Sequence, residues 1–557
     1  MQYSNKEIAQ QVINTCLDFN VISVVISPGS RNAPLIIEFD ANQQISKYSI
    51  VDERSAAFFA LGIAKETHKP VALVCSSGSA LLNYYPAIVE AFYSSIPLVV
   101  ISADRPKEMI DIGDGQTIRQ ENVYQNHIKF SANLSEKNSN KNDSILQNTF
   151  KELINKTPIH INVPFSEPLY ETTSDVLIER KQQETRINKD LLLDETPIDV
   201  DELQGFADIW NASKRKMILL GVHVVDEMIQ TQLNHLAKDP SVIILTENTA
   251  NVHHKKFITS IDQVIFPFSD INFERFKPDI LLTFGGMVVS KKIKQLLRKN
   301  KPKEHWHIDK KGALDTYQAL SHHFKVSATL FFSQFFFLTK PVVSTYQEKW
   351  LSSKYNRLKK HTSFVNDTSF SDLKVFSILN KKIPKGVNIE FSNSSTIRYS
   401  QLFSWDKSNQ IGCNRGASGI DGSTSTAVGV AVSSKKQTVF VTGDLSFFYD
   451  SNALWNNYIP SNFRIIILNN GGGGIFRFIP GPTTTNTLDY FETPHQLTAK
   501  QLCEMHQLDY QTADNENGLE IQLIAFFNKS NKPKLLEIFT PRKINAVILK
   551  EYFDNLI

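Results

Sequence analysis

Short apolar runs alternate along this chain with longer stretches in which apolar and polar residues mix. In the first third of the chain, the runs are Ile22–Ile26, Val71–Cys75, Leu98–Ile101 and Ile159–Val163. A second series comprises Lys216–Val222, Val242–Thr246, Ile280–Gly286 and Trp306–Asp309. Buried parallel strands are short and continuously apolar, whereas helices mix the two residue types. The pattern therefore predicts parallel sheets wrapped by helices.

Two later strands end in residues that suit a metal ion. The run Thr438–Thr442 leads into Gly443-Asp444, and Arg464–Leu468 is soon followed by Asn470 and the glycines 471–474. Parallel strands deliver their carboxyl ends to one edge of a sheet. A carboxylate, an amide oxygen and a backbone carbonyl, completed by phosphate oxygens, satisfy Mg²⁺. Glycines let the backbone approach phosphates closely. The alternative is that each motif is an ordinary turn.

The length of 557 residues exceeds what one hydrophobic core usually supports. We predict an α/β protein of three doubly wound parallel-sheet domains, spanning residues 1–175, 190–345 and 365–557. The charged, weakly periodic segment 171–189 marks the first boundary. The polar segment 136–144 is expected to form a surface loop.

Composition narrows the functional classes. A formal net charge of +3 without a basic run interleaved with aromatics gives nucleic-acid binding no support. The four cysteines are far apart, which argues against disulfides and for a reducing compartment. The amino terminus lacks the features of a signal peptide. The longest apolar tract, Ala328–Leu338, is too short for an integral membrane segment and is expected to be a core helix or a subunit contact. We therefore expect a cytoplasmic protein.

The metal motif also carries a family resemblance. Thiamin-diphosphate enzymes have Gly-Asp-Gly, about 25 residues and then Asn-Asn, and here Leu445 replaces the second glycine. That variant resembles one branch, the 2-succinyl-5-enolpyruvyl-6-hydroxy-3-cyclohexene-1-carboxylate synthases of menaquinone biosynthesis. The resemblance runs from end to end. Its motifs are Ser27–Arg31, Asp52–Ala57, Ser102–Pro106, Gly115–Gln120, Asn393-Ser394 with Arg398, and Asn414–Gly422.

The resemblance implies thiamin diphosphate and Mg²⁺ (or Mn²⁺) as cofactors, held by the third domain. The implied metal ligands are Asp444, Asn470 and the carbonyl of Gly472. The implied cofactor-binding residues are Glu53, Ser394, Ile420, Gly443, Asp444, Leu445, Asn470, Gly472, Gly473, Ile475 and Phe476. Four glycines stand where relatives often have a bulkier residue, so the backbone near Gly472 is a departure from the family pattern.

Glu53 has the most specific implied role. In the family the matching glutamate bonds N1′ of the aminopyrimidine and favours the tautomer that can remove the thiazolium C2 proton. Ile420 would hold the cofactor in its bent conformation, while Ile475 and Phe476 would line the site. The alternatives are that Glu53 caps a helix and that the apolar residues are plain core.

The implied reaction decarboxylates 2-oxoglutarate and adds the succinyl unit to isochorismate. Because both substrates carry two carboxylates, the site should be rich in arginine. The resemblance assigns isochorismate to Ser30, Arg31, Arg105, Gln116 and Lys291, and the 2-oxoglutarate end to Ser394, Arg398 and Arg415. Each cation could instead be an exposed salt-bridge partner. Lys292 competes with its neighbour Lys291 for the role.

Two rival functions stay open at this point. One is another thiamin-diphosphate decarboxylase or an acetolactate-type synthase, and the other is a non-catalytic cofactor-binding homologue. In the resembled family the active site lies between the first domain of one chain and the third domain of its partner. A homodimer or homotetramer is therefore expected.

Overall fold

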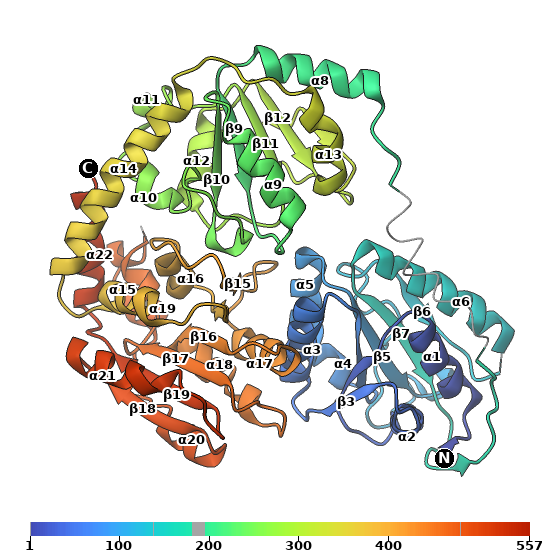
Figure 1. Cartoon of the computed structure of the whole chain (residues 1–557). Helices are drawn as coiled ribbons and strands as arrows, with labels where there is room; N and C mark the ends of the chain where they lie inside the picture. Colours follow the sequence, from blue (N-terminus) through green and yellow to red (C-terminus); the bar gives the residue numbers. More distant parts are fainter. Residues whose placement is uncertain (1, 138, 181–194, 480) are drawn as a thin grey trace.

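A computed structural model describes residues 2–137, 139–180, 195–479 and 481–557. Three parallel sheets follow one another along the chain, and helices cover both faces of each (Figure 1). The middle sheet lies above the other two in the view of Figure 1, and the first and third lie side by side below it. The predicted α/β fold class with three doubly wound sheets is confirmed.

The first sheet has the strand order β3-β2-β4-β5-β7-β6. Its strands are β2 (Ser23–Ile26), β3 (Ser46–Ser49), β4 (Val71–Cys75), β5 (Leu98–Asp104), β6 (Ser131–Asn133) and β7 (Ile159–Pro164). Its helices are α1 (Glu7–Asp18), α2 (Ala33–Ala41), α3 (Glu53–Thr67), α4 (Ala80–Asn83), α5 (Tyr85–Ser94) and α6 (Ser139–Lys151). A small antiparallel pair joins β1 (Tyr3–Ser4) to β8 (Thr172–Thr173).

The middle sheet has the order β10-β9-β11-β12-β13. Its strands are β9 (Lys216–Leu220), β10 (Val242–Thr246), β11 (Ile280–Phe284), β12 (Glu304–Ile308) and β13 (His322–Phe324). Its helices are α8 (Val200–Ala212), α9 (Glu227–Leu236), α10 (Ile261–Ile265), α11 (Asp270–Phe273), α12 (Lys291–Lys299) and α13 (Ala328–Phe335). The long helix α14 (Tyr346–Asp367) leads from this sheet to the third (Figure 1).

The third sheet has the order β15-β14-β16-β17-β19-β18. Its strands are β14 (Asn388–Phe391), β15 (Gln410–Gly412), β16 (Thr438–Gly443), β17 (Phe463–Asn469), β18 (Asp509–Ala513) and β19 (Lys534–Phe539). Its helices are α15 (Asp372–Lys382), α16 (Ser395–Ser400), α17 (Ser423–Ser433), α18 (Asp444–Tyr449), α19 (Leu488–Glu492), α20 (Lys500–Met505), α21 (Glu516–Phe526) and α22 (Ile544–Asn555).

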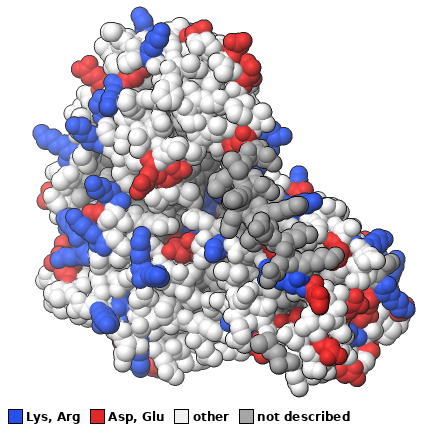
Figure 2. Space-filling view, turned by 45° about the vertical axis from the view of Figure 1, so that its right-hand side comes forward, with Lys and Arg blue, Asp and Glu red and all other residues white. Residues whose placement is uncertain are grey.

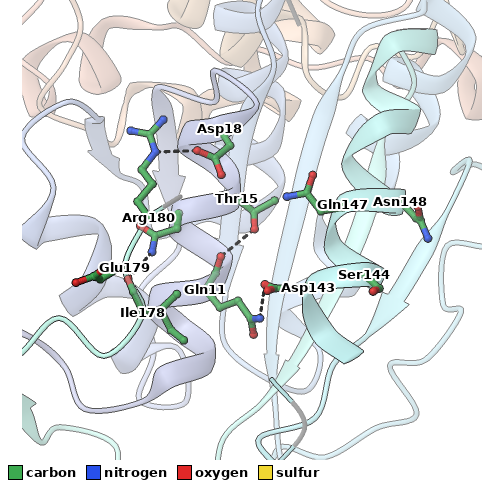
Figure 3. A pocket seen from close by; sticks show the side chains of 11 residues that line it. Gln11, Thr15, Asp18, Asp143, Ser144, Gln147, Asn148, Ile178, Glu179 and Arg180 are labelled. Carbon is green, nitrogen blue, oxygen red and sulfur yellow. Dashed lines mark hydrogen bonds and ion pairs between the residues drawn. The ribbon is translucent and has the colours of Figure 1, made fainter. Parts of the chain in front are cut away.

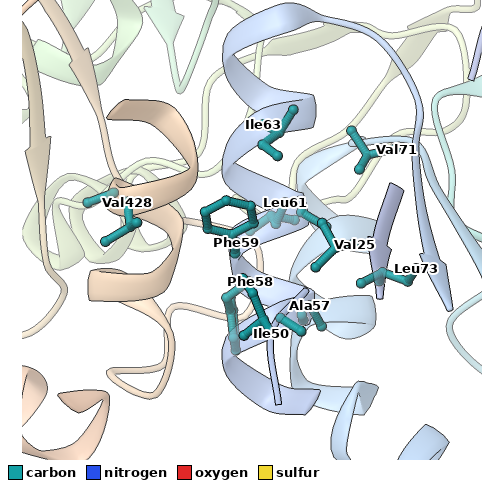
Figure 4. Packing of buried hydrophobic residues seen from close by; sticks show 14 of the residues in the cluster. Val25, Ile50, Ala57, Phe58, Phe59, Leu61, Ile63, Val71, Leu73 and Val428 are labelled. Atoms are coloured by element: carbon teal, nitrogen blue, oxygen red, sulfur yellow. The ribbon is translucent and has the colours of Figure 1, made fainter. Parts of the chain in front are cut away.

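Helices α3 and α17 join the first and third sheets. Figure 4 shows Phe58 and Phe59 on the side of α3 that faces Val428 of α17, with Leu61 toward Val25, and one buried cluster contains residues from both sheets. The two helices cross at close range, and a glycine on each helix makes this crossing possible. A Cβ at Gly62 would lie 2.9 Å from the backbone nitrogen of Val430, and one at Gly429 would collide with the carbonyl of Phe59. Helices whose backbones approach this closely hold the two sheets together as one packed body.

The structure corrects one expectation about the first domain. Residues 139–144 of the predicted surface loop form the first turns of α6, on which Asn142 and Leu146 are buried. The tract Ala328–Leu338 contains α13, whose buried Phe331, Phe332 and Phe335 confirm the core-helix alternative, although Phe337 is exposed. Each sheet lies inside one predicted domain range, but the boundaries themselves stay a prediction. The predicted start at residue 190 lies outside the described residues.

Candidate active site

The predicted metal ligands meet at the carboxyl edge of the third sheet. Strands β16 and β17 are parallel neighbours with Gly443 opposite Leu468, so Asp444 and Asn470 follow adjacent strand ends. The carboxylate Oδ2 of Asp444 accepts a hydrogen bond from the backbone nitrogen of Gly472 at 3.0 Å. The structure therefore brings Asp444, Asn470 and Gly472 together.

The side-chain oxygen of Asn470 is free to bind a cation. Its amide nitrogen donates to Asp372 at 3.0 Å, which fixes the orientation of the amide, while its buried Oδ1 has no hydrogen-bond partner among the described residues. Asp372 also accepts a hydrogen bond from Thr540 at 2.6 Å, and burial raises its pKa to about 6. A buried oxygen without a partner is costly unless a ligand satisfies it. The residues present thus fit a hard divalent cation.

The glycine run shapes the backbone beside this oxygen. Gly471 and Gly472 have φ values of +75° and +147°, and a Cβ at Gly472 would lie 2.7 Å from the carbonyl oxygen of Glu492. Glu492 is fully buried, and although burial favours its neutral form, Arg542 and Arg477 hold its pKa at about 2. This ion-paired carboxylate fixes the segment against which the glycines pack, and the nitrogen of Gly473 donates to its carbonyl at 2.6 Å.

His495 is a neighbour of the metal motif that the sequence did not single out. Its Nε2 lies 3.3 Å from Oδ2 of Asp444. No cluster of three or more His, Cys, Asp or Glu suited to a metal occurs in the described part of the chain. The predicted site is of another kind, with one carboxylate, one amide oxygen and one backbone carbonyl as ligands.

The residues predicted for the cofactor surround the same edge. Ser394 follows β14, the neighbour of β16, and has a φ of +72°. The carbonyl of Ile420 accepts from Ser446 in α18 at 3.0 Å. Ile475 and Phe476 lie in a 3₁₀ turn directly after the glycines and are half-buried. Leu445 donates its backbone nitrogen to Asp444 Oδ1 at 2.6 Å, and Gly443 ends β16.

Arg398 and Arg415 converge near Ser394. Arg415 donates to Oδ1 of Asn393 at 2.8 Å, and the amide of Asn393 donates to the carbonyls of Asn414 and Gly419. The buried Nε atoms of Arg398 and Arg415 lack hydrogen-bond partners, and neither guanidinium has an ion pair within the described ranges. Two arginines with unused donors are suited to a carboxylate ligand.

The middle domain adds a lysine, Lys294, and an acid, Glu247, to this region. Lys294 lies within electrostatic range of Arg398, Arg415 and Glu247, and burial lowers its pKa. Burial also raises the pKa of Glu247 to about 7, while its carboxylate accepts from the backbone nitrogens of Val289 and Ser290 at 2.6 and 2.8 Å. Neither Lys294 nor Glu247 was predicted from the sequence. Lys294 lies one turn after Lys291 on α12, a spacing that could have indicated it.

Lys291 itself is exposed at the start of α12. It makes no hydrogen bond or ion pair with the described residues. Lys292 instead donates to the carbonyl of Phe266 and lies over the ring of Phe266. Of these two lysines, Lys291 has the free ammonium group.

The residues predicted for isochorismate lie along the carboxyl edge of the first sheet. Ser30 and Arg31 follow β2, and Arg105 follows β5. Arg105 donates to the carbonyl of Gly115, beside Gln116, and pairs with Asp114 at 3.2 Å. Arg31 is buried, pairs with Glu167 at 2.9 Å and donates to the carbonyl of Phe165. Ser30 and Gln116 are exposed.

Glu53 is the first residue of α3 and is half-buried. Its Oε2 accepts from the amide of Asn83 at 3.2 Å. The helix is capped by Asp52, whose side chain accepts from the nitrogen of Ser55. The capping alternative for Glu53 is therefore wrong, because its neighbour performs that role.

Charged residues of both signs occur on one face of the molecule. Lysine, arginine, aspartate and glutamate are intermixed on the face in Figure 2. Figure 3 shows a polar pocket between α1, α6 and residues 178–180, lined among others by Gln11, Asp143 and Arg180, and it contains none of the predicted site residues. No helix in the described residues combines the length and apolarity that crossing a membrane requires.

Two family models match the chain. Residues 6–132 match the thiamine pyrophosphate enzyme N-terminal TPP binding domain, and residues 203–389 match the middle domain of thiamine pyrophosphate enzymes. Proteins named 2-succinyl-5-enolpyruvyl-6-hydroxy-3-cyclohexene-1-carboxylate synthase from Flavobacterium johnsoniae and Flavobacterium psychrophilum are each 51% identical, with all of both chains covered. The protein of that name from Christiangramia forsetii is 52% identical over all of this chain and 99% of its own.

The chain belongs to this synthase family. It is a thiamin-diphosphate-dependent enzyme, and the family resemblance stated from the motifs is confirmed.

Proposed function

We propose that this protein decarboxylates 2-oxoglutarate and adds the succinyl unit to isochorismate, giving 2-succinyl-5-enolpyruvyl-6-hydroxy-3-cyclohexene-1-carboxylate and carbon dioxide in menaquinone biosynthesis. The observation that carries the proposal is the full-length 51% identity to synthases of that name. The unpaired Nε atoms of Arg398 and Arg415 at the same sheet edge as Asp444 support it.

Asp444, Asn470 and the carbonyl of Gly472 would hold Mg²⁺ or Mn²⁺ against the cofactor diphosphate. Asp372 would keep the Asn470 oxygen turned toward the metal, because the Asn470 amide nitrogen already donates to it. Ser394, Gly443, Leu445 and Gly473 would contact the cofactor. Ile420, Ile475 and Phe476 would provide the apolar wall.

Bound thiamin diphosphate supplies an electron sink for the electron pair released when a 2-oxo acid loses carbon dioxide. Glu53 would bind the aminopyrimidine nitrogen and hold a proton there. Arg398, Arg415 and Ser394 would orient the 2-oxoglutarate carboxylates, with the free donors of the two arginines as the main attraction.

Ser30, Arg31, Arg105, Gln116 and Lys291 would receive isochorismate. Arg31 and Arg105 already bind Glu167 and Asp114. A substrate carboxylate would therefore share or replace these partners, whereas Lys291 is free among the described residues.

We further propose that the enzyme is a homodimer, or a dimer of dimers. Large apolar side chains are exposed around the first turn of α3, namely Val51, Leu82, Tyr449 and Trp455. Apolar groups that gather at a functional helix end suit a partner surface. The four cysteines are free and buried, which supports a cytoplasmic location.

The test is carbon dioxide release from 2-oxoglutarate by purified protein with thiamin diphosphate and Mg²⁺. Isochorismate absorbance is followed in parallel. Release coupled to isochorismate loss, dependent on both cofactors, is the expected result. Use of pyruvate with isochorismate untouched would contradict the proposal and favour an acetolactate-type synthase.

Glu53→Gln is the sharpest single variant. A glutamine keeps the size of the side chain but is a weak partner for a proton on the aminopyrimidine, so we expect turnover to fall at least about 100-fold with folding retained. The measurement is kcat together with circular dichroism of the fold. Near-normal turnover would contradict the role of Glu53.

A further inference from the structure

The two residues that flank Glu53 are both held by the third domain. Oδ2 of Asp52 accepts a hydrogen bond from the amide nitrogen of Asn452 at 2.7 Å. Arg54 donates to the carbonyl of Tyr449 at 2.8 Å, and its guanidinium lies 4.6 Å from the centre of the Tyr449 ring. Residues 449–452 thus contact the start of α3 on both sides of Glu53, through hydrogen bonds and a cation–π contact.

The segment 449–452 is itself held in place by Asp450. Asp450 is fully buried and accepts from the backbone nitrogen and hydroxyl of Ser425, at 2.7 and 2.9 Å, at the start of α17. Its Oδ1 also lies 3.9 Å from Arg54. Asp450 therefore links the segment 449–452 to α17, the helix that packs closely against α3 at Gly62 and Gly429.

Helix α18 connects the same segment to the metal motif. It begins at Asp444 and ends at Tyr449. One short helix therefore has the predicted metal ligand at its first residue and a contact to Arg54 at its last.

We propose that Asp52, Arg54, Asp450 and Asn452 form a clamp that positions Glu53 for the cofactor. The inference rests on the role proposed for Glu53. The first turn of a helix has few hydrogen bonds of its own, so its direction depends on outside contacts. Within the described residues the Glu53 side chain has one hydrogen bond, from Asn83, so its position is set by the backbone that the clamp holds. Errors of about 1 Å in such a group can cost roughly 100-fold in rate.

The test uses Asn452→Ala and Arg54→Lys. The first removes the donor to Asp52, and the second keeps the charge but loses the planar fork that reaches Tyr449. We expect kcat to fall about tenfold or more, with the KM for 2-oxoglutarate changed less than about twofold, because the clamp does not touch that substrate. The circular dichroism band of the bound aminopyrimidine should weaken. Amide hydrogen exchange at residues 53–56 of the cofactor-free protein should accelerate.

Asn462→Ala is the matched control, because Asn462 makes a similar hydrogen bond to the carbonyl of Lys436 in the same domain, away from Glu53. Asn462→Ala should leave kcat, the KM for 2-oxoglutarate, the circular dichroism band and the hydrogen exchange at residues 53–56 unchanged. If Asn452→Ala does not fold, the isosteric Asn452→Asp replaces it, since a second carboxylate would repel Asp52.

The outcomes separate the clamp from the function it serves. If Glu53→Gln abolishes turnover while both clamp variants keep normal kcat and exchange, the clamp is refuted and the proposed function stands. If Glu53→Gln keeps turnover, the role of Glu53 fails, and the clamp fails with it.

Discussion

Gly472 shows how one residue can limit the proposed metal site. Its φ of +147° is strained for any other residue, and an added Cβ would meet the carbonyl of Glu492 at 2.7 Å. We predict that Gly472→Ala lowers Mg²⁺ affinity about tenfold or more and costs roughly 1–3 kcal/mol of stability. Isothermal titration with Mg²⁺ and thiamin diphosphate, together with urea unfolding, measures both effects.

Gly386→Ala is the control for this variant. Gly386 also has a positive φ, of +75°, but no atom of the described residues lies within 4 Å of its added Cβ. It should lose stability without losing Mg²⁺ affinity. Equal affinity losses in both variants would show that backbone strain alone, and not the contact with Glu492, explains the result.

At the same scale, the sequence could predict Asp444 and Asn470 but not Asp372. The first two directly follow apolar runs, and strand ends are visible in a sequence. Asp372 begins α15, far from Asn470 along the chain, and reaches it only through the packing of the third domain. His495 and Glu247 were missed for the same reason, because only tertiary contacts bring them to the site.

The crossing of α3 and α17 makes a prediction at the scale of elements. Gly62→Ala would push a methyl group into the backbone of α17, so the helices must separate. We expect a loss of roughly 1–3 kcal/mol or more in the free energy of unfolding, measured by urea titration.

Gly205→Ala gives the opposite expectation in another helix. Gly205 is exposed inside α8, and no atom in the described part of the chain lies within 4 Å of an added Cβ. Alanine should stabilise the protein by about 0.5–1 kcal/mol, because it restricts the unfolded chain. If Gly62→Ala and Gly205→Ala changed the free energy of unfolding by similar amounts in the same direction, the close crossing of α3 and α17 would be refuted.

Three strands of the first sheet share a buried histidine. His160 in β7 contacts the hydroxyls of Ser102 in β5 and Ser131 in β6, at 2.7 and 3.3 Å, and burial lowers its pKa to about 3. Below pH 6.5 the unfolded chain binds a proton that the folded protein excludes, so stability falls as the pH falls from 6.5 toward 3. Linkage gives a loss of about 2 kcal/mol by pH 5 from this group.

The measurement is urea unfolding of the wild type and His160→Asn at pH 7.5 and pH 5. The variant should lose less stability on acidification than the wild type does. His323→Asn, at a half-buried position in β13, is the comparison. An identical pH response in wild type and His160→Asn would contradict the role of His160.

The sequence predicted the bounds of buried strands better than the start of a helix that begins with polar residues. Val71–Cys75 and Val242–Thr246 were predicted with the bounds that β4 and β10 have, because both are buried along their whole length. The start of α6 was missed because Ser139, Asn140 and Asn142 are polar residues typical of loops. The helix forms because its later turns bury Leu146 and Phe150 against the sheet.

The arrangement of whole chains can be tested by complementation. If each site combines Glu53 of one chain with Asp444 of its partner, a mixed dimer of Glu53→Gln and Asp444→Ala chains contains one intact site. Random mixing of the two inactive variants should then restore about a quarter of the wild-type activity. The chains must first be dissociated and reassembled, and activity per chain is measured.

A single-chain site gives a different result. Every chain in the mixture would then carry a defect in its own site, and activity would stay at the level of the separate variants. Wild-type chains taken through the same dissociation and reassembly are the control for recovery, and Glu53→Gln remixed with itself gives the background activity.

The α3–α17 crossing also has a consequence for the synthesis of the protein. Its two glycines are separated by roughly 370 residues, so at about 5–20 residues per second a ribosome needs some 20 to 70 s to add α17 after α3. Throughout that interval the Phe58 and Phe59 side of α3 has no third domain to pack against. The nascent first domain therefore presents an apolar surface while translation continues. The yield of folded protein in cells should depend on chaperones that bind such surfaces.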